Sequence, residues 1–268
     1  MTAFDQAERR SWAGQATAYA SSFAKLCAYP VPWVLDAAEV CAGTRVLDVG
    51  TGTGTAALAA CERGARVTAV DAEAGMVALA ARAASAIDVR LAALPHLPFG
   101  DHEFDAVIGN FVLNHVGRPR DAVAELRRVT RPGGRIAVTI WAVPGAPGQA
   151  LLGQAVQAAG VARPAHLPAL APEDDFPRTE HGFAALLSEM GLADVSCDTL
   201  TWNHRTTPDE WWSGPAAGVA TIGQIVRSQP NAIIMEIKGH YDALSAQFAD
   251  PDGVLMLPHA ALMAHGRV

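Results

Sequence analysis

The sequence contains few basic residues and no basic cluster. Its 20 Lys and Arg residues are outnumbered by 27 Asp and Glu, the formal net charge is −7, and lysine occurs only at Lys25 and Lys238. A polyanion such as DNA or RNA is bound largely through clustered basic side chains that displace its counterions. The composition therefore argues against a nucleic-acid partner.

Long apolar runs and paired cysteines are also missing. No stretch of 18 apolar residues is present to span a bilayer, and charged residues in the first twelve positions replace the apolar core of a signal peptide. The four cysteines form no C-x-x-C pair, so neither a metal site nor a redox dithiol is expected. We expect a cytoplasmic protein with no membrane partner, whose cysteines stay reduced.

What the sequence does contain is a regular alternation of strand and helix patterns. With 268 residues, half of them hydrophobic and 18% charged, the chain can form one large α/β domain. Strands are expected at 45–49, 66–71, 89–92, 104–110, 135–141, 195–202 and 255–264. Helices are expected at 55–63, 74–84, 119–129, 150–159 and 183–190. This order predicts a doubly wound, mainly parallel seven-stranded sheet of the Rossmann-like type.

Two helical additions flank this pattern. Residues 1–42 read as an N-terminal helical cap, and residues 43–268 as the sheet domain. Residues from about 203 to 250 read as a helical lid, in which Thr207 caps a helix that contains Trp211 and Trp212. Because a strand follows the lid, we expect it to be an insertion in the sheet domain.

The segment 46–54 predicts a nucleoside-binding loop. It leaves a strand, carries Gly50, Gly52 and Gly54 at alternating positions, and enters a helix whose first N–H groups are free. Asp71 ends the next strand, where a carboxylate can accept hydrogen bonds from both hydroxyls of a ribose.

The loop by itself leaves two cofactors open. Residues 52–57 satisfy the G-x-G-x-x-A pattern of dinucleotide enzymes, so an NAD-dependent oxidoreductase is one alternative. Asp48, just ahead of the glycines, would repel a pyrophosphate but attract the ammonium group of an amino acid. This second acid favours a nucleoside that carries an amino-acid moiety over NAD.

The ordered motifs resemble a known family. Segment 46–54 is similar to motif I of the class I S-adenosylmethionine (SAM)-dependent methyltransferases, and 67–71 to their acidic second motif. The family's later motifs are similar to four further segments of this chain, residues 97–99, 104–107, 113–116 and 126–134. The resemblance covers about residues 10–141 and is closest to the small-molecule branch, which includes quinone and natural-product methyltransferases. It implies methyl transfer from SAM to an O, N or C atom of a small aromatic or apolar metabolite of secondary metabolism, with S-adenosylhomocysteine (SAH) as product.

The same resemblance implies a set of cofactor contacts. The glycines border the methionine part, Asp71 binds the ribose, and the aromatic residues near the N-terminus close over the cofactor. The family often has an Asp where this chain has Ala93, so adenine recognition rests on backbone groups near Leu94. The full expected set is Trp12, Tyr19, Asp48, Gly50, Thr51, Gly52, Asp71, Ala72, Met76, Ala93, Leu94 and Asn110.

The residues that act on the methyl acceptor are less defined by the sequence. The candidate general bases are His115 and His204. The alternative interpretation is that His115 packs against the following turn and that His204 lies in an exposed loop. An aromatic substrate pocket is predicted from Trp202, Trp211 and Trp212. The alternative is that these side chains only fill the core of the lid. A third hypothesis is a non-catalytic methyltransferase-like binding module, which the intact glycines and Asp71 oppose. The oligomeric state is open, a homodimer being one option.

Overall fold

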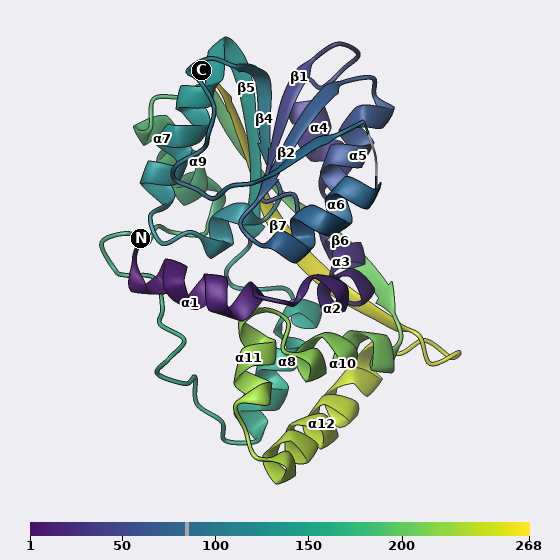
Figure 1. The fold of residues 1–268 in the computed structure, drawn as a ribbon. Helices are drawn as coiled ribbons and strands as arrows, with labels where there is room; N and C mark the ends of the chain where they lie inside the picture. Colours follow the sequence, from purple (N-terminus) through teal and green to yellow (C-terminus); the bar gives the residue numbers. More distant parts are fainter. Residues whose placement is uncertain (84–85) are drawn as a thin grey trace.

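A single seven-stranded sheet organises the computed structural model, which describes residues 1–83 and 86–268 (Figure 1). The strand order is β3-β2-β1-β4-β5-β7-β6, in which β1 to β5 pair in parallel and β7 is antiparallel to both β5 and β6. The expected doubly wound, mainly parallel sheet is confirmed. The strands are β1 (Arg45–Val49), β2 (Arg66–Asp71), β3 (Asp88–Leu91), β4 (Phe104–Gly109), β5 (Thr130–Trp141), β6 (Ala193–Thr206) and β7 (Leu255–Arg267).

The sheet domain has one helix before β1 and further helices that connect its strands. They are α4 (Val31–Ala37), α5 (Thr55–Glu62), α6 (Ala74–Ala83), α7 (Pro119–Val129) and α9 (Glu180–Glu189), with a 3-10 turn η1 (Val112–His115) after β4. The remaining helices are α1 (Ala3–Trp12), α2 (Ala16–Ser21), α3 (Ala24–Cys27), α8 (Pro147–Ala158), α10 (Pro208–Ala217), α11 (Ala220–Arg227) and α12 (Asn231–Ser245), with the 3-10 turn η2 (Ala246–Phe248). The expected end of the α6 helix at residue 84 lies outside the described residues.

The sheet separates two apolar cores. Strand β1 shows how: its Val46 packs with α4 and α5 on one face, whereas Leu47 packs with α7 and α9 on the other. Both side chains are fully buried, as is usual for a parallel strand covered on both faces. The sheet edge at the carboxyl ends of β1, β2 and β4 stays free for a ligand, which is where open α/β sheets bind them.

Helix α7 begins and ends where the sequence pattern places it. Pro119 occupies the first turn, where its missing N–H leaves no hydrogen bond unmade. Ala122, Val123, Leu126 and Val129 then recur at helical spacing, and all four are buried against the sheet. The polar face of the helix carries its arginines and acids.

The helical additions gather beyond the carboxyl edge of the sheet, at the bottom of Figure 1, where the long strands β6 and β7 reach them. Helices α8, α10, α11 and α12 form a third core with the N-terminal cap, built on Leu26, Leu151, Trp211 and Tyr241. None of the helices in residues 1–83 and 86–268 is long and apolar enough to cross a membrane.

The lid begins later than the sequence pattern predicts. Residues 203–206, which we expected in the lid, continue β6 and pair with residues 255–258 of β7. Helix α10 starts only at Pro208, and there the expected cap is present: Thr207 Oγ1 accepts a hydrogen bond from the Glu210 N–H at 3.1 Å.

Candidate functional site

The glycine loop turns sharply between β1 and α5. Gly50 and Gly52 have φ values of +70° and +57°, the left-handed region that residues with a Cβ atom rarely occupy. A Cβ at Gly50 would stand 2.5 Å from Cγ2 of Val112, so the loop also needs glycine for lack of space. At Gly52 the nearest side chain is Tyr19, whose Cε1 would lie 3.5 Å from an added Cβ.

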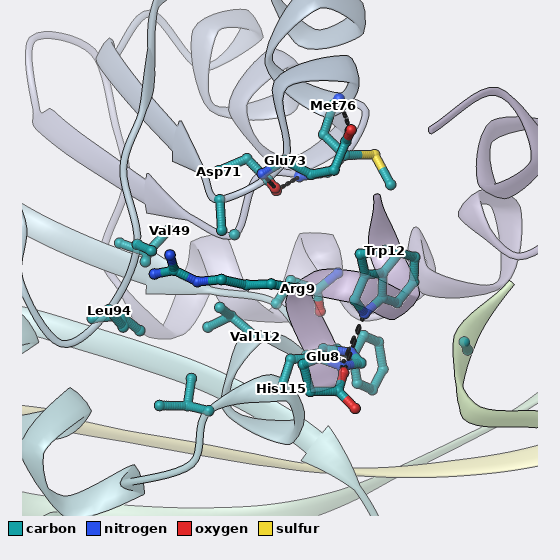
Figure 2. A pocket seen from close by; sticks show the side chains of 18 of the residues that line it. Glu8, Arg9, Trp12, Val49, Asp71, Glu73, Met76, Leu94, Val112 and His115 are labelled. Carbon is teal, nitrogen blue, oxygen red and sulfur yellow. Dashed lines mark hydrogen bonds and ion pairs between the residues drawn. The ribbon is translucent and has the colours of Figure 1, made fainter. Parts of the chain in front are cut away.

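Asp71 ties this loop to the end of β2. Its Oδ2 accepts a hydrogen bond from Gly52 N at 2.8 Å, and its Oδ1 accepts one from Glu73 N at 3.0 Å. Glu73 in turn accepts from Met76 N at 2.7 Å, so one chain of bonds fixes the start of α6 (Figure 2). Burial raises the pKa of Asp71, while both backbone N–H groups act to lower it.

Asp48 is a second carboxylate, buried beneath the loop with only 1% of its surface exposed. Its Oδ2 accepts a hydrogen bond from Thr51 Oγ1 at 2.7 Å, and its Oδ1 has no partner in the described chain. Asp48 and Thr51 line a small cavity of about 30 Å³, together with Tyr19 and Asn110. A buried carboxylate oxygen without a partner is costly, and a cationic group in this cavity would satisfy it.

Asp48 therefore predicts a pH-dependent stability. Burial raises its pKa to about 6 from an ordinary 3.8, helped by the nearby Asp71 and opposed by Thr51 and the nearby backbone N–H of Ala57. Between these values the folded chain holds a proton that the unfolded chain releases, so the free energy of unfolding falls as pH rises through this window. The loss amounts to about 3 kcal/mol by pH 7. Urea denaturation from pH 4 to 7 should show this fall in the wild type and not in Asp48→Asn, and parallel curves for the two proteins would refute it.

A large cavity of about 1140 Å³ opens beside the loop, between the sheet edge, α1 and the lid. Single ligand pockets usually measure about 300–1,000 Å³, so this one has room for two ligands side by side. It brings together most of the predicted site residues, several of which Figure 2 shows around the cavity. Those lining it are Trp12, Tyr19, Gly50, Gly52, Asp71, Ala72, Met76, Ala93, Leu94, Asn110, His115 and Trp211.

Asn110 joins the end of β4 to the N-terminal cap. Its Nδ2 donates to the Cys27 carbonyl at 2.6 Å, and its Oδ1 accepts from Thr139 Oγ1 at 2.7 Å. Thr139 Oγ1 also accepts a hydrogen bond from Phe111 N at 2.9 Å. The amide of Asn110 thus has a fixed orientation at the wall of the cavity.

Helix α1 adds a residue that the sequence analysis missed. Glu8 Oε2 lies 2.7 Å from His115 Nδ1 and also accepts a hydrogen bond from Trp12 Nε1 at 3.3 Å (Figure 2). Asp5 Oδ1 accepts from Gly117 N at 2.6 Å, so α1 meets the 112–117 segment at two points. Glu8 and Trp12 are one helical turn apart, and this spacing was the available signal that they share a face.

Three of the residues predicted to act on the methyl acceptor lie outside the wall of the large cavity. His204, expected in a loop after its strand, is instead buried within β6, and burial lowers its pKa. Trp202 is in the same strand and stacks on Tyr29, with ring centroids 5.6 Å apart. His204 was misplaced because β6, the edge strand beyond β7, runs on to Thr206, whereas Trp202 lies in the strand as expected. Trp212 packs in the lid against Tyr241.

The part of the cavity nearest the lid has aromatic and aliphatic walls, and we call it the lid lobe. Phe111 stacks on Trp141 with ring centroids 4.0 Å apart, and Phe23 meets Trp211 edge-on at 5.0 Å. The lobe is formed by Phe23, Leu26, Phe111, Trp141, Gln149, Leu152, Gly153, Trp211, Ala220, Ile222 and His259. None of these side chains is an acid, a lysine or an arginine, so the lobe favours a neutral, flat, apolar ligand.

Comparison with known proteins points to the same region of the chain. Residues 47–138 match a family model described as a methyltransferase domain. The demethylmenaquinone methyltransferase of Renibacterium salmoninarum is 40% identical over 111 residues, which are 41% of this chain and 47% of that protein. The chain thus matches about half the length of this curated relative.

Solved structures show a shared fold over more of the chain. The YcgJ protein of Bacillus subtilis matches with a TM-score of 0.56 at 22% identity, over 89% of this chain and 97% of its own. The geranyl diphosphate C-methyltransferase of Streptomyces coelicolor was solved with Mg²⁺, geranyl diphosphate and SAH. It matches with a TM-score of 0.51 at 17% identity, over 90% of this chain and 79% of its own.

Proposed function

We propose that this chain, a member of the class I SAM-dependent methyltransferases, transfers a methyl group from SAM to a neutral small molecule held in the lid lobe. The observation that carries the proposal is the extent of the large cavity. It joins the glycine loop and Asp71, which fit a nucleoside, to a lobe with aromatic walls. A donor at one end and an acceptor at the other would lie in the same water-poor space.

The residues present fit SAM better than a plain nucleoside. Asp71 would take the ribose hydroxyls, while Met76 and the backbone near Leu94 would border the adenine. Asp48, with its unpartnered Oδ1 beside the small cavity, would receive the positive end of the methionine moiety. SAM supplies an already activated methyl group, so the chain need not create an electrophile.

The remaining work of the chain is alignment and proton transfer. Trp12 and Tyr19, whose rings meet at 5.6 Å, would cover the reacting groups and exclude water. Holding two reactants in line contributes on the order of 7–11 kcal/mol to a reaction of this kind. Where the acceptor must lose a proton, His115 would take it, held in place by Glu8.

An NAD-dependent oxidoreductase remains the rival function because residues 52–57 satisfy the dinucleotide pattern. The buried, unpartnered carboxylate of Asp48 opposes it, since a pyrophosphate at the loop would meet a like charge. Calorimetric titration with SAM, SAH and NAD separates the two functions. We expect binding of SAM and SAH and none of NAD, and NAD binding without SAM binding would refute the proposal.

A further inference from the structure

The lid lobe contains polar atoms that are buried without a partner. They are Trp211 Nε1, Gln149 Oε1 and His259 Nε2, and all three side chains line the cavity. Buried polar atoms in native proteins are nearly always hydrogen-bonded, and exceptions at a cavity wall often mark a missing ligand or water. A ligand that fills this lobe should therefore offer hydrogen-bonding groups as well as an apolar surface.

The hydrogen-bonding role of His259 is fixed by its neighbour on β7. His259 Nδ1 lies 2.8 Å from the carbonyl oxygen of Leu257, and a carbonyl can only accept. Nδ1 must therefore carry the proton, and Nε2 presents a lone pair. Burial lowers the pKa of His259 to about 4 against the opposing effect of the Leu257 carbonyl, so the ring is neutral near pH 7.

Trp211 supplies the complementary group. Its indole N–H can only donate, and its ring centroid is 5.4 Å from that of His259, at an interplanar angle of 75°. Both rings line the cavity, so a hydroxyl placed between them can accept from the indole N–H and donate to the unprotonated imidazole nitrogen. Trp141, 6.0 Å from His259, adds a flat apolar wall beside the pair.

We propose that Trp211 and His259 form a recognition site for a hydroxyl group on an aromatic methyl acceptor. The hydroxyl donates to His259 Nε2 and accepts from Trp211 Nε1, which a ketone, an ether or a charged group cannot do. This inference rests on the proposed function, because it defines the substrate class of the same cavity. His259 is then a specificity residue, at the lid end of the cavity and away from the glycine loop.

The test compares three flat probes that differ only in hydrogen bonding: 1-naphthol, 1-methoxynaphthalene and naphthalene. Each is titrated calorimetrically into the full chain saturated with SAH, so that no methyl transfer occurs. We expect 1-naphthol to bind the wild type about 10-fold or more tightly than either analogue, since sites built for a hydroxyl reject ligands without it. A wild type that binds all three probes equally overturns the proposal.

Substitution assigns the preference to its residues. His259→Phe keeps a flat ring and should remove the preference for 1-naphthol while leaving naphthalene affinity unchanged. His259→Gln, which retains an acceptor near the position of Nε2, should keep part of it. Trp211→Phe removes the donor and should reduce the same preference, so the test does not depend on one variant folding.

His204→Phe is the matched control. This histidine is also buried with an unpartnered Nδ1, its ring lies 6.1 Å from that of His259 and 5.3 Å from that of Trp211, and it is not part of the cavity wall. The control should keep the wild-type preference, and equal loss in both histidine variants would contradict a specific role for His259. SAH titration of each protein separates the two proposals. Failure of the wild type to bind SAH refutes the methyltransferase function, whereas SAH binding without a preference for 1-naphthol refutes only this inference.

Discussion

Asp71→Ala is expected to weaken the binding of SAM and SAH by about 100-fold or more. The variant loses the acceptor for the ribose hydroxyls, and hydrogen bonds to a charged group contribute about 1.5–3 kcal/mol each. It also releases the N–H groups of Gly52 and Glu73, which the carboxylate now holds at 2.8 and 3.0 Å. The glycine loop would therefore lose part of its fixed shape as well. Calorimetric titration of SAH measures the effect directly.

Two further variants make this result specific. Asp71→Asn keeps an oxygen that can accept from one backbone N–H, so its loss of affinity should lie between those of the wild type and Asp71→Ala. Asp88→Ala removes an exposed aspartate from the neighbouring strand β3, where it pairs with Arg90, and should leave SAH affinity unchanged. Unaltered SAH affinity in Asp71→Ala would show that the ribose assignment is wrong.

The part of the fold that local sequence determines was predictable. The glycine loop follows from the glycines that its turn requires, and α7 follows from a proline at its start and an apolar stripe. The end of β6 was not, because residues 203–206 are strand only through their pairing with residues 255–258. Such pairing is set by distant partners, and local β propensity carries little information about it.

The candidate site likewise contains residues that local sequence predicts and residues that only tertiary contacts bring together. Asp48, Gly50, Gly52 and Asp71 belong to one β-α-β unit, so their order along the chain already places them at one sheet edge. Glu8 meets His115 across 107 positions of sequence, a contact that depends on how the N-terminal cap docks. His204 was predicted at the site and His259 was not, because the sequence does not show that His259 lies on the inner strand β7 and His204 on the edge strand β6.

His115→Gln is expected to lower kcat for methyl transfer to a hydroxylated aromatic acceptor by about 100-fold or more, while SAH affinity stays unchanged. A positioned general base contributes about 10²–10⁴-fold to a rate, and the glutamine cannot take up a proton. Glu8→Gln should lower kcat by about 10-fold, because the neutral amide no longer orients His115 or stabilises its protonated form. SAH release with 1,4-dihydroxynaphthalene as acceptor, whose second hydroxyl is not held by Trp211 and His259, measures both rates.

The double variant separates positioning from simple support of the fold. If Glu8 acts only through His115, Glu8→Gln should have no further effect on kcat once His115 is glutamine. If the two residues act independently, the fold-losses in kcat of the two single variants should multiply in the double variant. Asp5→Asn is the matched control, since Asp5 also fastens α1 to the 112–117 segment through Gly117 N but does not contact His115. A kcat loss in Asp5→Asn as large as in Glu8→Gln would assign the effect to docking of α1. An unchanged kcat in Asp5→Asn, with no further loss in the double variant, would leave Glu8 as the residue that orients the base.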